Sequence, residues 1–308
     1  MNPRRIRIYI MLVVVAAIWG IAGPVIKYTL DWFTPSIFLT YRFLISAIIA
    51  LVFIILKGIK IPKDPKLILY IIIYCLLTST LGLGILFLGY TQTSAIDAGL
   101  IGATAPIFIA IAGNFYLHEH LTKAKKMGIM IAFTGTILTI LEPALRNNDG
   151  FGGIYGNLLI LFSVLLGTVS AVMTKIVLRQ KVQPDQLTNF VFIIGLLTML
   201  PITLFYNSPA QIYQQIINAP LIFHLGVFYM AIFSGTIAYY LWSRAEKSIE
   251  IGDVGVFGYL APIFGTPLAV IWLGEKITVP FIIGAVIIAF GVVLAEYKKP
   301  KNVVKSPL

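Results

Sequence analysis

The chain has 308 residues, of which 59% are hydrophobic and only 11% charged, and it carries a formal net charge of +11 at pH 7. Soluble domains contain about 25% charged residues, so this composition excludes an ordinary water-soluble enzyme. Because a membrane-spanning helix needs about 20 mainly apolar residues, the length leaves room for roughly ten spans and for no sizeable soluble domain.

Ten apolar segments, separated by short charged or turn-rich connections, follow one another along the chain. They cover residues 8–28, 35–56, 67–89, 95–117, 125–141, 155–177, 186–206, 220–242, 251–273 and 280–296. The first segment follows Arg4, Arg5 and Arg7 as a signal peptide would, but it is too long for one, and similar segments recur to the end of the chain. Backbone polar groups in hydrocarbon must pair within their own segment or in a closed barrel, so segments of this length are predicted to be helices. The predicted fold class is an all-α integral membrane protein with ten transmembrane helices.

The first three segments carry residues suited to the wall of a cavity. Trp19 lies near the middle of the first segment, away from the interfacial zones where tryptophan usually anchors, and Gly23 follows one turn later. Arg42, in the second segment, is an intramembrane charge and therefore a functional candidate, for which we expect a structural or gating pair. Tyr74 and Thr78 in the third segment share a helical face. Apart from Arg42, these residues are candidate substrate contacts, although Trp19 is equally a candidate for a packed or lipid-facing aromatic.

Proline lies near the middle of the fourth and ninth segments, at Pro106 and Pro262. Each proline removes one helical hydrogen bond and invites a kink. The freed carbonyl groups either face a substrate or only let the helix curve for packing, and the sequence leaves both open. Gly102 belongs to a series of small residues that favours close helix packing. Gly102 and Tyr259 are also candidate substrate contacts.

Hydroxyl groups recur in the sixth and eighth segments. Ser170 and Thr174 share one face of the sixth segment, and Ser234 in the eighth aligns with Thr78 in the third. Hydroxyls often bond to carbonyl groups of their own helix, so each is a candidate either for substrate contact or for such a bond. Lys175 lies near the inner end of its segment, where it either extends to the interface or contacts an anionic group of the substrate.

Carboxylates are predicted only near the ends of segments. Asp97 and Asp253 start the fourth and ninth segments, where they are expected to cap unpaired N–H groups. Glu119 and Glu275 lie at the far ends of the same segments, and we expect them to order loops or gates rather than to relay protons. With no carboxylate near the predicted midplane, the sequence leaves a facilitator, an exchanger and a proton antiporter open.

No metal or cofactor site is predicted. His118, Glu119 and His120 look like a ligand cluster, but residues two apart on a helix point to nearly opposite faces, and the helical two-histidine zinc site needs a spacing of four. Cys75 is the single cysteine, so the chain has no internal disulfide. We therefore expect no cofactor and no catalytic residue.

The positive charge is distributed by side of the membrane. Counted in alternate connections, 18 of the 23 Lys and Arg residues fall on the side of both termini, and Lys27, Arg146 and Lys276 fall on the other. The positive-inside rule then predicts a multi-pass protein of the cell inner membrane with its N- and C-termini in the cytoplasm. The net charge thus predicts topology, with the lipid bilayer as partner, and removes the reason to expect nucleic acid.

The second half of the chain repeats the first. A shift of 156 residues aligns positions 80–138 with 236–294 without a gap. The shared pairs include Asp97/Asp253, Gly99/Gly255, Gly102/Gly258, Pro106/Pro262, Leu117/Leu273, Glu119/Glu275, Thr122/Thr278, Gly128/Gly284 and Gly135/Gly291. Each repeat holds five spans, an odd number, so the second enters the membrane from the opposite side, and we divide the chain into inverted repeats at 1–145 and 146–308. Such repeats are typical of secondary transporters, which hold substrate near the midplane and rock around it.

Three motifs resemble the EamA family of the drug/metabolite transporter superfamily. They are Trp19-Gly20 followed by Pro35 and Tyr41-Arg42-Phe43; Ala98-Gly99-Leu100-Ile101-Gly102 leading to Pro106 and Glu119; and Pro262 leading to Leu273-Gly274-Glu275. The resemblance covers nearly all of the chain and implies a ten-helix fold, a central cavity lined mainly by segments one, three, four, six, eight and nine, and export of a small metabolite. The chain departs from the family at His118-Glu119, where Gly-Glu is usual. The second repeat has Gly167 and Val191 near the places of the Trp-Gly and Arg elements.

We therefore predict a secondary transporter that moves a small metabolite by alternating access, and not an enzyme. The expected substrate is an amino acid or a related amphipathic compound, exported by a monomer or homodimer across the inner membrane. One alternative is uptake or exchange of a nucleoside- or phosphate-bearing metabolite, for which Lys27, Arg42 and Lys175 would supply charge. An integral membrane enzyme is a remote alternative, because it needs acid, base or metal ligands clustered at one depth.

Overall fold

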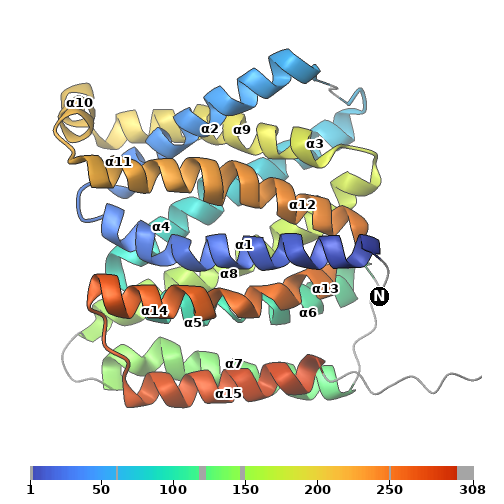
Figure 1. Ribbon diagram of the computed structural model, residues 1–308, viewed down its shortest axis with the longest axis vertical. Helices are drawn as coiled ribbons and strands as arrows, with labels where there is room; N and C mark the ends of the chain where they lie inside the picture. The colour runs from blue at the N-terminus through green and yellow to red at the C-terminus, as the bar shows by residue number, and fades with distance from the viewer. Residues whose placement is uncertain (1–2, 60–61, 118–122, 146–149, 250, 297–308) are drawn as a thin grey trace, which may run out of the picture.

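The structure, a computed structural model, describes residues 3–59, 62–117, 123–145, 150–249 and 251–296 (Figure 1). Within these ranges every regular element is a helix. The first half comprises α1 (Pro3–Thr29), α2 (Pro35–Lys57), α3 (Pro65–Cys75), η1 (Leu76–Leu83), α4 (Gly84–Gln92), α5 (Ala95–Gly102), α6 (Ala105–Leu117) and α7 (Lys123–Leu145). The second half comprises α8 (Gly150–Arg179), α9 (Pro184–Tyr206), α10 (Pro209–Ile217), α11 (Leu221–Phe228), η2 (Tyr229–Ile237), α12 (Ala238–Ser248), α13 (Ile251–Gly255), η3 (Val256–Leu260), α14 (Ala261–Leu273) and α15 (Val279–Glu296).

The long helices lie side by side across the bundle (Figure 1). Seven stretches of described residues are long and apolar enough to span a membrane: Ile6–Thr29, Pro35–Lys57, Pro65–Gln92, Ala95–Tyr116, Gly153–Arg179, Pro184–Tyr206 and Leu221–Ser248. The other three predicted spans correspond to α7, to α14 with the 3-10 helix before it, and to α15, and all three are helical. The chain is therefore a multi-pass, all-helical membrane protein, as the sequence predicts.

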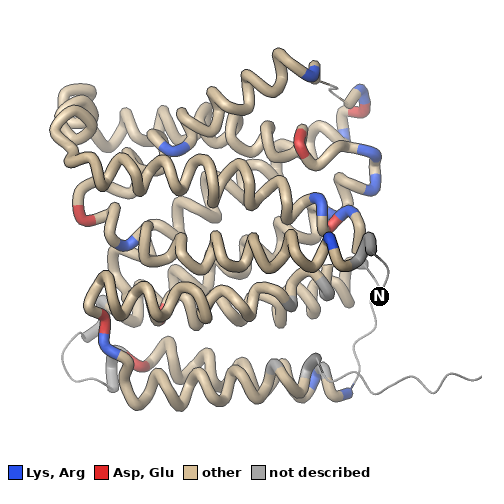
Figure 2. The backbone as a smooth tube through the Cα atoms, in the orientation of Figure 1, with Lys and Arg blue, Asp and Glu red and all other residues tan. Residues whose placement is uncertain are grey.

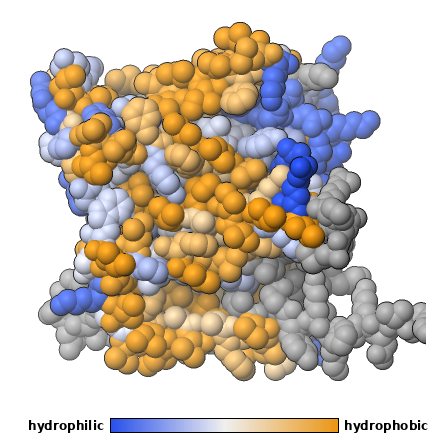
Figure 3. Space-filling view, in the orientation of Figure 1, coloured by the Kyte–Doolittle hydropathy of each residue, from blue (hydrophilic) through white to orange (hydrophobic). Residues whose placement is uncertain are grey.

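The surface consists of an apolar belt and two more polar ends. Hydrophobic residues cover the middle of the bundle in Figure 3, and large apolar side chains such as Ile55 and Phe205 are exposed. Lys and Arg lie mainly at the end of the bundle where the N-terminus lies (Figure 2). An apolar belt between polar ends is the surface that a lipid bilayer covers.

The fourth and ninth spans are interrupted at equivalent places. α5 ends at Gly102 before α6 begins at Ala105, and the 3-10 helix η3 precedes α14, which begins at Ala261. The two prolines predicted to kink these spans lie in the first turns of α6 and α14. Proline is tolerated there because its missing N–H would have no helical partner. At the predicted kinks the structure thus has a two-residue turn between α5 and α6 and a change from 3-10 to α-helix before Pro262.

The third and eighth spans each contain a π-helical segment, η1 and η2, which the apolar pattern does not predict. A π turn places one more residue in each turn than an α turn does, and it occurs frequently at functional sites. The two segments lie at similar places in the two repeats. They change which side chains face the interior of the bundle over the middle of both spans.

Two differences between the predicted and observed ends of spans concern carboxylates. The eighth span continues to Ser248, whereas the apolar segment ends at residue 242, so Glu246 lies inside the span. The helix continues because this carboxylate faces inward and is 1% exposed. At the start of α5 the N-cap is Ser94, whose hydroxyl accepts from the N–H of Asp97 at 2.9 Å, so the predicted cap Asp97 lies in the first helical turn instead.

One edge of the bundle is formed by α7 and α15, which lie along each other (Figure 1). Their backbones approach closely at Gly291, where a Cβ atom would lie 2.5 Å from the backbone nitrogen of Ala132. Only glycine fits at such a crossing, as small residues generally do where membrane helices touch. This pair closes one side of the molecule without reaching the central cavity.

Candidate functional site

A cavity of about 370 Å³ lies between the two halves of the chain, and both halves line it. Its volume is within the range of roughly 300–1,000 Å³ that small-molecule sites occupy. The first, third, fourth, sixth, eighth and ninth spans supply most of the wall, and α2 supplies Arg42 alone. The described residues of α7, α9 and α15 do not reach the wall.

Ten of the twelve predicted substrate contacts line this cavity. They are Trp19, Gly23, Tyr74, Thr78, Gly102, Pro106, Ser170, Thr174, Ser234 and Pro262. Arg42, for which we expected a gating or structural pair, lines the cavity as well. Predicted residues from seven spans, which lie far apart in the sequence, are thus brought to one cavity.

Lys175 and Tyr259 are the two predicted contacts that do not line the cavity. The Nζ atom of Lys175 donates to the backbone carbonyls of Glu246 and Ile249 at 2.5 and 2.6 Å. These bonds join α8 to the end of the eighth span. The ammonium of Lys175 is therefore directed at the protein backbone.

Glu275 caps a helix instead of lining the cavity. Its Oε1 accepts from the N–H of Ala95 at 2.7 Å, and its Oε2 accepts from the N–H of Ile96 at 2.9 Å. A carboxylate at this place satisfies two unpaired N–H groups at the positive end of α5. Glu275 thus orders the junction between the end of the ninth span and the start of the fourth span. Glu119, its expected counterpart, lies outside the described residues.

Aromatic side chains form one face of the cavity. The ring of Trp19 lies 5.6 Å from that of Tyr239 and 5.0 Å from that of Trp242, measured between centroids. Its Nε1 donates to the carbonyl of Ser234, in the π segment η2, at 3.1 Å. Trp19 is therefore fixed between the first and eighth spans. Tyr239 and Trp242 were not predicted, although the aromatic run at residues 239–242 is a signal for such a face.

Hydroxyl groups are the uncharged polar groups of the cavity wall. Thr174 donates to the carbonyl of Ser170 at 2.9 Å, a bond within its own helix. The hydroxyls of Thr78 and Ser170 are buried and have no hydrogen-bond partner among the described residues. A buried hydroxyl normally has a partner. These two hydroxyls are therefore available to a bound molecule.

Two charged side chains of opposite sign line the cavity, Arg42 and Glu246. Their exposed fractions are 0% and 1%. Within the described part of the chain, no hydrogen-bond partner reaches the three guanidinium nitrogens of Arg42 or the Oε2 atom of Glu246. The sequence predicted the intramembrane arginine but placed Glu246 in a connection. The repeat offers a signal, because Glu246 aligns with Tyr90, which also lines the cavity.

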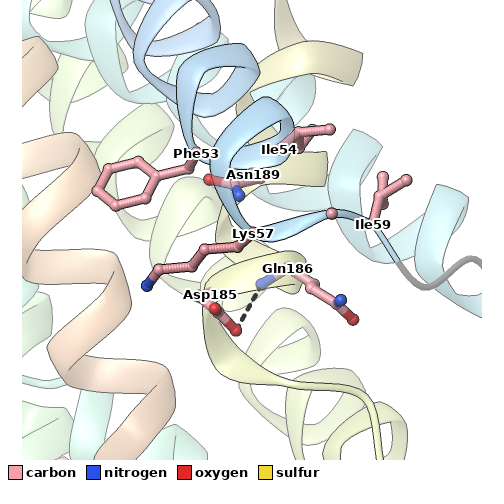
Figure 4. Close-up of a pocket in the computed structure, with 8 residues that line it drawn as sticks. Phe53, Ile54, Lys57, Ile59, Asp185, Gln186 and Asn189 are labelled. Carbon is pink, nitrogen blue, oxygen red and sulfur yellow. Dashed lines mark hydrogen bonds between the residues drawn. The ribbon is translucent and has the colours of Figure 1, made fainter.

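A second depression lies at the surface between the end of α2 and the start of α9 (Figure 4). Its volume is about 10 Å³, which is room for little more than one water molecule. The ammonium of Lys57 lies 5.3 Å from the ring centroid of Phe53, and Asp185 accepts from the N–H of Gln186 at 3.0 Å. This depression is too small for a metabolite. A third hollow, of about 580 Å³, lies at one end of the bundle, where helix ends and the connection between α14 and α15 line it. The central cavity lies instead within the bundle between the two halves of the chain, and it is the candidate site.

The described residues contain no group of three or more His, Cys, Asp or Glu side chains that could hold a metal ion. Cys75 is a buried free thiol. The sequence cluster of His118, Glu119 and His120 lies outside the described residues.

Known proteins share both the sequence pattern and the fold. The model of the EamA-like transporter family matches the chain twice, at residues 6–141 and 154–297. "Uncharacterized transporter YyaM" of Bacillus subtilis is 27% identical over 95% of this chain and 94% of its own length. The "Probable amino-acid metabolite efflux pump" of Salmonella typhimurium is 26% identical over 91% of this chain and 92% of its own length. A solved crystal structure superposes with a TM-score of 0.68 at 16% identity, covering 94% of this chain and 97% of the other, so the fold is shared.

Proposed function

Because the chain belongs to the EamA-like transporter family and is thus a membrane transporter rather than an enzyme, we propose that it exports amino acids or related amphipathic metabolites by alternating access. The observation that carries the proposal is the cavity of about 370 Å³, which both halves of the chain line. Its wall combines aromatic rings with free hydroxyls and two buried charges. A molecule of amino-acid size fits there with its apolar body against the rings and its polar groups at the charges.

Alternating access requires the cavity to open to each side of the membrane in turn. The wall contains the breaks between α5 and α6 and before α14, together with the π segments η1 and η2. At such places the regular hydrogen-bond pattern is already interrupted, so neighbouring helices can shift with little loss of backbone bonding. We propose that the repeats 1–145 and 146–308 rock around the cavity, in a monomer or homodimer of the inner membrane with both termini in the cytoplasm.

The name of the Salmonella relative supports the choice of substrate class. That protein is named a probable amino-acid metabolite efflux pump, and the match covers 92% of its own length. The aromatic face around Trp19 favours molecules with an apolar part, since buried rings contribute large contact areas. Export of amphipathic amino-acid metabolites therefore agrees with both the relative and the wall.

Transport of a nucleoside- or phosphate-bearing metabolite is less well supported. A phosphate ester carries about 1.5 to 2 negative charges at neutral pH, which calls for more than one cation. Lys27 donates to the carbonyls of Tyr90 and Thr93 at 2.9 and 2.8 Å, and Lys175 is also bonded to carbonyls. Of the three basic residues considered, Arg42 alone lines the cavity, which favours a substrate with a single negative charge.

Counterflow in proteoliposomes tests the function. Liposomes that contain the purified protein are loaded with an unlabelled amino acid and diluted into a trace of the radiolabelled compound. We expect saturable uptake that the internal load stimulates. Amino acids, amines, nucleosides and phosphate esters are compared in one panel to assign the class. Flux equal to that of protein-free liposomes for every compound would remove the proposal.

A matched pair of glycine substitutions links the flux to the cavity. A Cβ atom at Gly102 or at Gly84 meets no atom within 4 Å, so both positions have room for a larger side chain. Gly102 lines the cavity, whereas Gly84 does not. We expect Gly102→Leu to abolish counterflow and Gly84→Leu to preserve it. Equal flux in the two variants would place the transport path elsewhere.

A further inference from the structure

Arg42 is a buried charge that the protein does not neutralise. Its side chain is 0% exposed and lies on the cavity wall. Its Nε, Nη1 and Nη2 atoms have no hydrogen-bond partner among the residues that the structure describes. A guanidinium has five N–H donors, and burying them unpaired is strongly unfavourable. Charges that membrane proteins nevertheless keep within their spans are typically functional.

The surroundings of Arg42 are aromatic. The ring centroid of Phe43 lies 5.9 Å from its Cζ atom, and Tyr239 is its electrostatic neighbour. Glu246, the second charged residue of the wall, keeps its own Oε2 atom without a hydrogen-bond partner among the described residues. The two opposite charges therefore make no hydrogen bond to each other, although both residues line the cavity.

We propose that Arg42 binds the carboxylate of the transported molecule, so that the substrates are monocarboxylic acids with an apolar or aromatic body. This inference rests on the proposed function and deepens it by naming the recognised group. The planar guanidinium can donate two parallel hydrogen bonds to one carboxylate, which is the geometry that arginine provides and lysine does not. The aromatic face of Trp19, Tyr239 and Trp242 takes the apolar body.

The position of Arg42 is consistent with recognition rather than packing. α2 supplies no other described residue to the cavity wall. A purely structural arginine would use its donors on carbonyl groups, as the half-buried Lys27 and Lys175 do. The guanidinium nitrogens of Arg42 instead have no hydrogen-bond partner among the described residues.

The proposed contact between Arg42 and the substrate carboxylate is called the anchor below. Equilibrium binding tests this anchor separately from flux. L-leucine and L-leucinamide, and L-phenylalanine and L-phenylalaninamide, are pairs that differ at the carboxylate. We expect the wild-type protein to bind each acid roughly tenfold or more tightly than its amide, because the amide loses charge-assisted hydrogen bonds. N-acetyl-leucine and N-acetyl-phenylalanine keep the carboxylate and lack the ammonium, so we expect them to bind like the acids. Trp19 and Trp242 on the wall make tryptophan fluorescence a readout of occupancy.

Three variants assign the preference to Arg42. Arg42→Gln is expected to bind acid and amide equally, and Arg42→Lys to keep part of the preference because it retains the charge but not the planar fork. Arg244→Gln is the control, since Arg244 is exposed and donates to the hydroxyl of Tyr240 at 2.8 Å. If Arg42→Gln does not fold, the acid-to-amide ratios of the wild type and of Arg42→Lys decide.

The outcomes separate the anchor from the transport function. Acids that bind no better than their amides to the wild-type protein, or a preference that survives in Arg42→Gln, would overturn the anchor and leave transport untouched. Acid-selective binding without counterflow would overturn the transport proposal and leave the anchor in place. Acid-selective binding that Arg42→Gln removes and Arg244→Gln keeps supports the anchor.

Discussion

Lys27 and Lys175 bind equivalent carbonyl groups at opposite ends of the bundle. The acceptors are the carbonyls of Tyr90 and Thr93 for the first lysine and of Glu246 and Ile249 for the second. The second pair of acceptors lies 156 residues after the first, which is the shift that aligns the two repeats. Each ammonium satisfies carbonyl groups at the C-terminal, negative end of a helix. In each inverted repeat, lysine-to-carbonyl hydrogen bonds thus join the first span to the third.

Removing either lysine is expected to destabilise the protein. Lys27→Met and Lys175→Met keep the apolar stem and lose the ammonium, so two carbonyls in each case lose a charged donor. Hydrogen bonds to charged groups contribute about 1.5–3 kcal/mol, and we expect a loss of roughly this size in the free energy of unfolding in detergent. Lys57→Met is the control, because Lys57 is exposed and its ammonium lies 5.3 Å from the centroid of the Phe53 ring rather than at helix-end carbonyls. Equal losses of unfolding free energy in all three variants would show that these lysine-to-carbonyl hydrogen bonds do not stabilise the protein.

The crossing of α1 and α14 is expected to tolerate no added methyl group. A Cβ at Gly20 would lie 2.3 Å from the carbonyl oxygen of Ala261, and one at Gly265 would lie 2.6 Å from that of Gly20. Both obstacles are backbone atoms, so Gly20→Ala should lower the free energy of unfolding by about 1–3 kcal/mol and slow counterflow. Gly99→Ala, on the same wall but with open space around its Cβ, should leave unfolding unchanged. Identical melting of the two variants would show that the crossing can widen freely.

Glu246→Gln is expected to lower counterflow. The amide removes a buried charge on the cavity wall, and a charge retained inside a span indicates a role in transport. Glu142→Gln is the matched control, since Glu142 is also buried but accepts from the hydroxyl of Thr278 at 2.6 Å and does not line the cavity. We expect Glu142→Gln to keep its flux, because the amide oxygen can still accept from Thr278. Unchanged flux in Glu246→Gln would exclude a role for its charge.

Residues 64 and 214 are predicted to face opposite sides of the membrane, because five spans, the first of which begins at Pro65, separate them. Asp64→Cys and Gln214→Cys introduce thiols at exposed positions, and the native Cys75 is buried. In intact cells a membrane-impermeant maleimide should label Gln214→Cys, and it should label Asp64→Cys only after permeabilisation. Labelling of both from one side would be incompatible with the orientation proposed here.

Much of the fold could be predicted from the sequence, because membrane helices are recognised by the length and hydropathy of their segments. The inverted repeat and the breaks at Pro106 and Pro262 could be predicted too, since proline and a matched spacing are visible in one chain. The π segments could not, because Leu76–Leu83 and Tyr229–Ile237 contain residues that an α-helix accepts equally well. Whether the backbone hydrogen bonds of these two segments follow the π or the α pattern is decided by contacts with other helices.

The candidate site could be predicted where polar, small or proline residues interrupt an apolar helix, which describes most of the wall. Glu246 was not predicted because a hydropathy window ends at the first charged residues. Such a window cannot distinguish a carboxylate that faces a cavity from one that faces water. Lys175 donates to carbonyls 71 and 74 residues away, and no local pattern reports such a contact. The unpaired state of Arg42 likewise depends on what the other spans bring near it.

The division of labour among the spans has a consequence for diversification. The described residues of α7, α9 and α15 hold the bundle together without touching the cavity. Substitutions of the residues that line the cavity therefore alter which substrate is bound, while the helices that hold the bundle together stay the same. A single architecture can thus be retuned for different cargo by changing a few inward-facing side chains, and chimeras that exchange only those positions should inherit the selectivity of the donor.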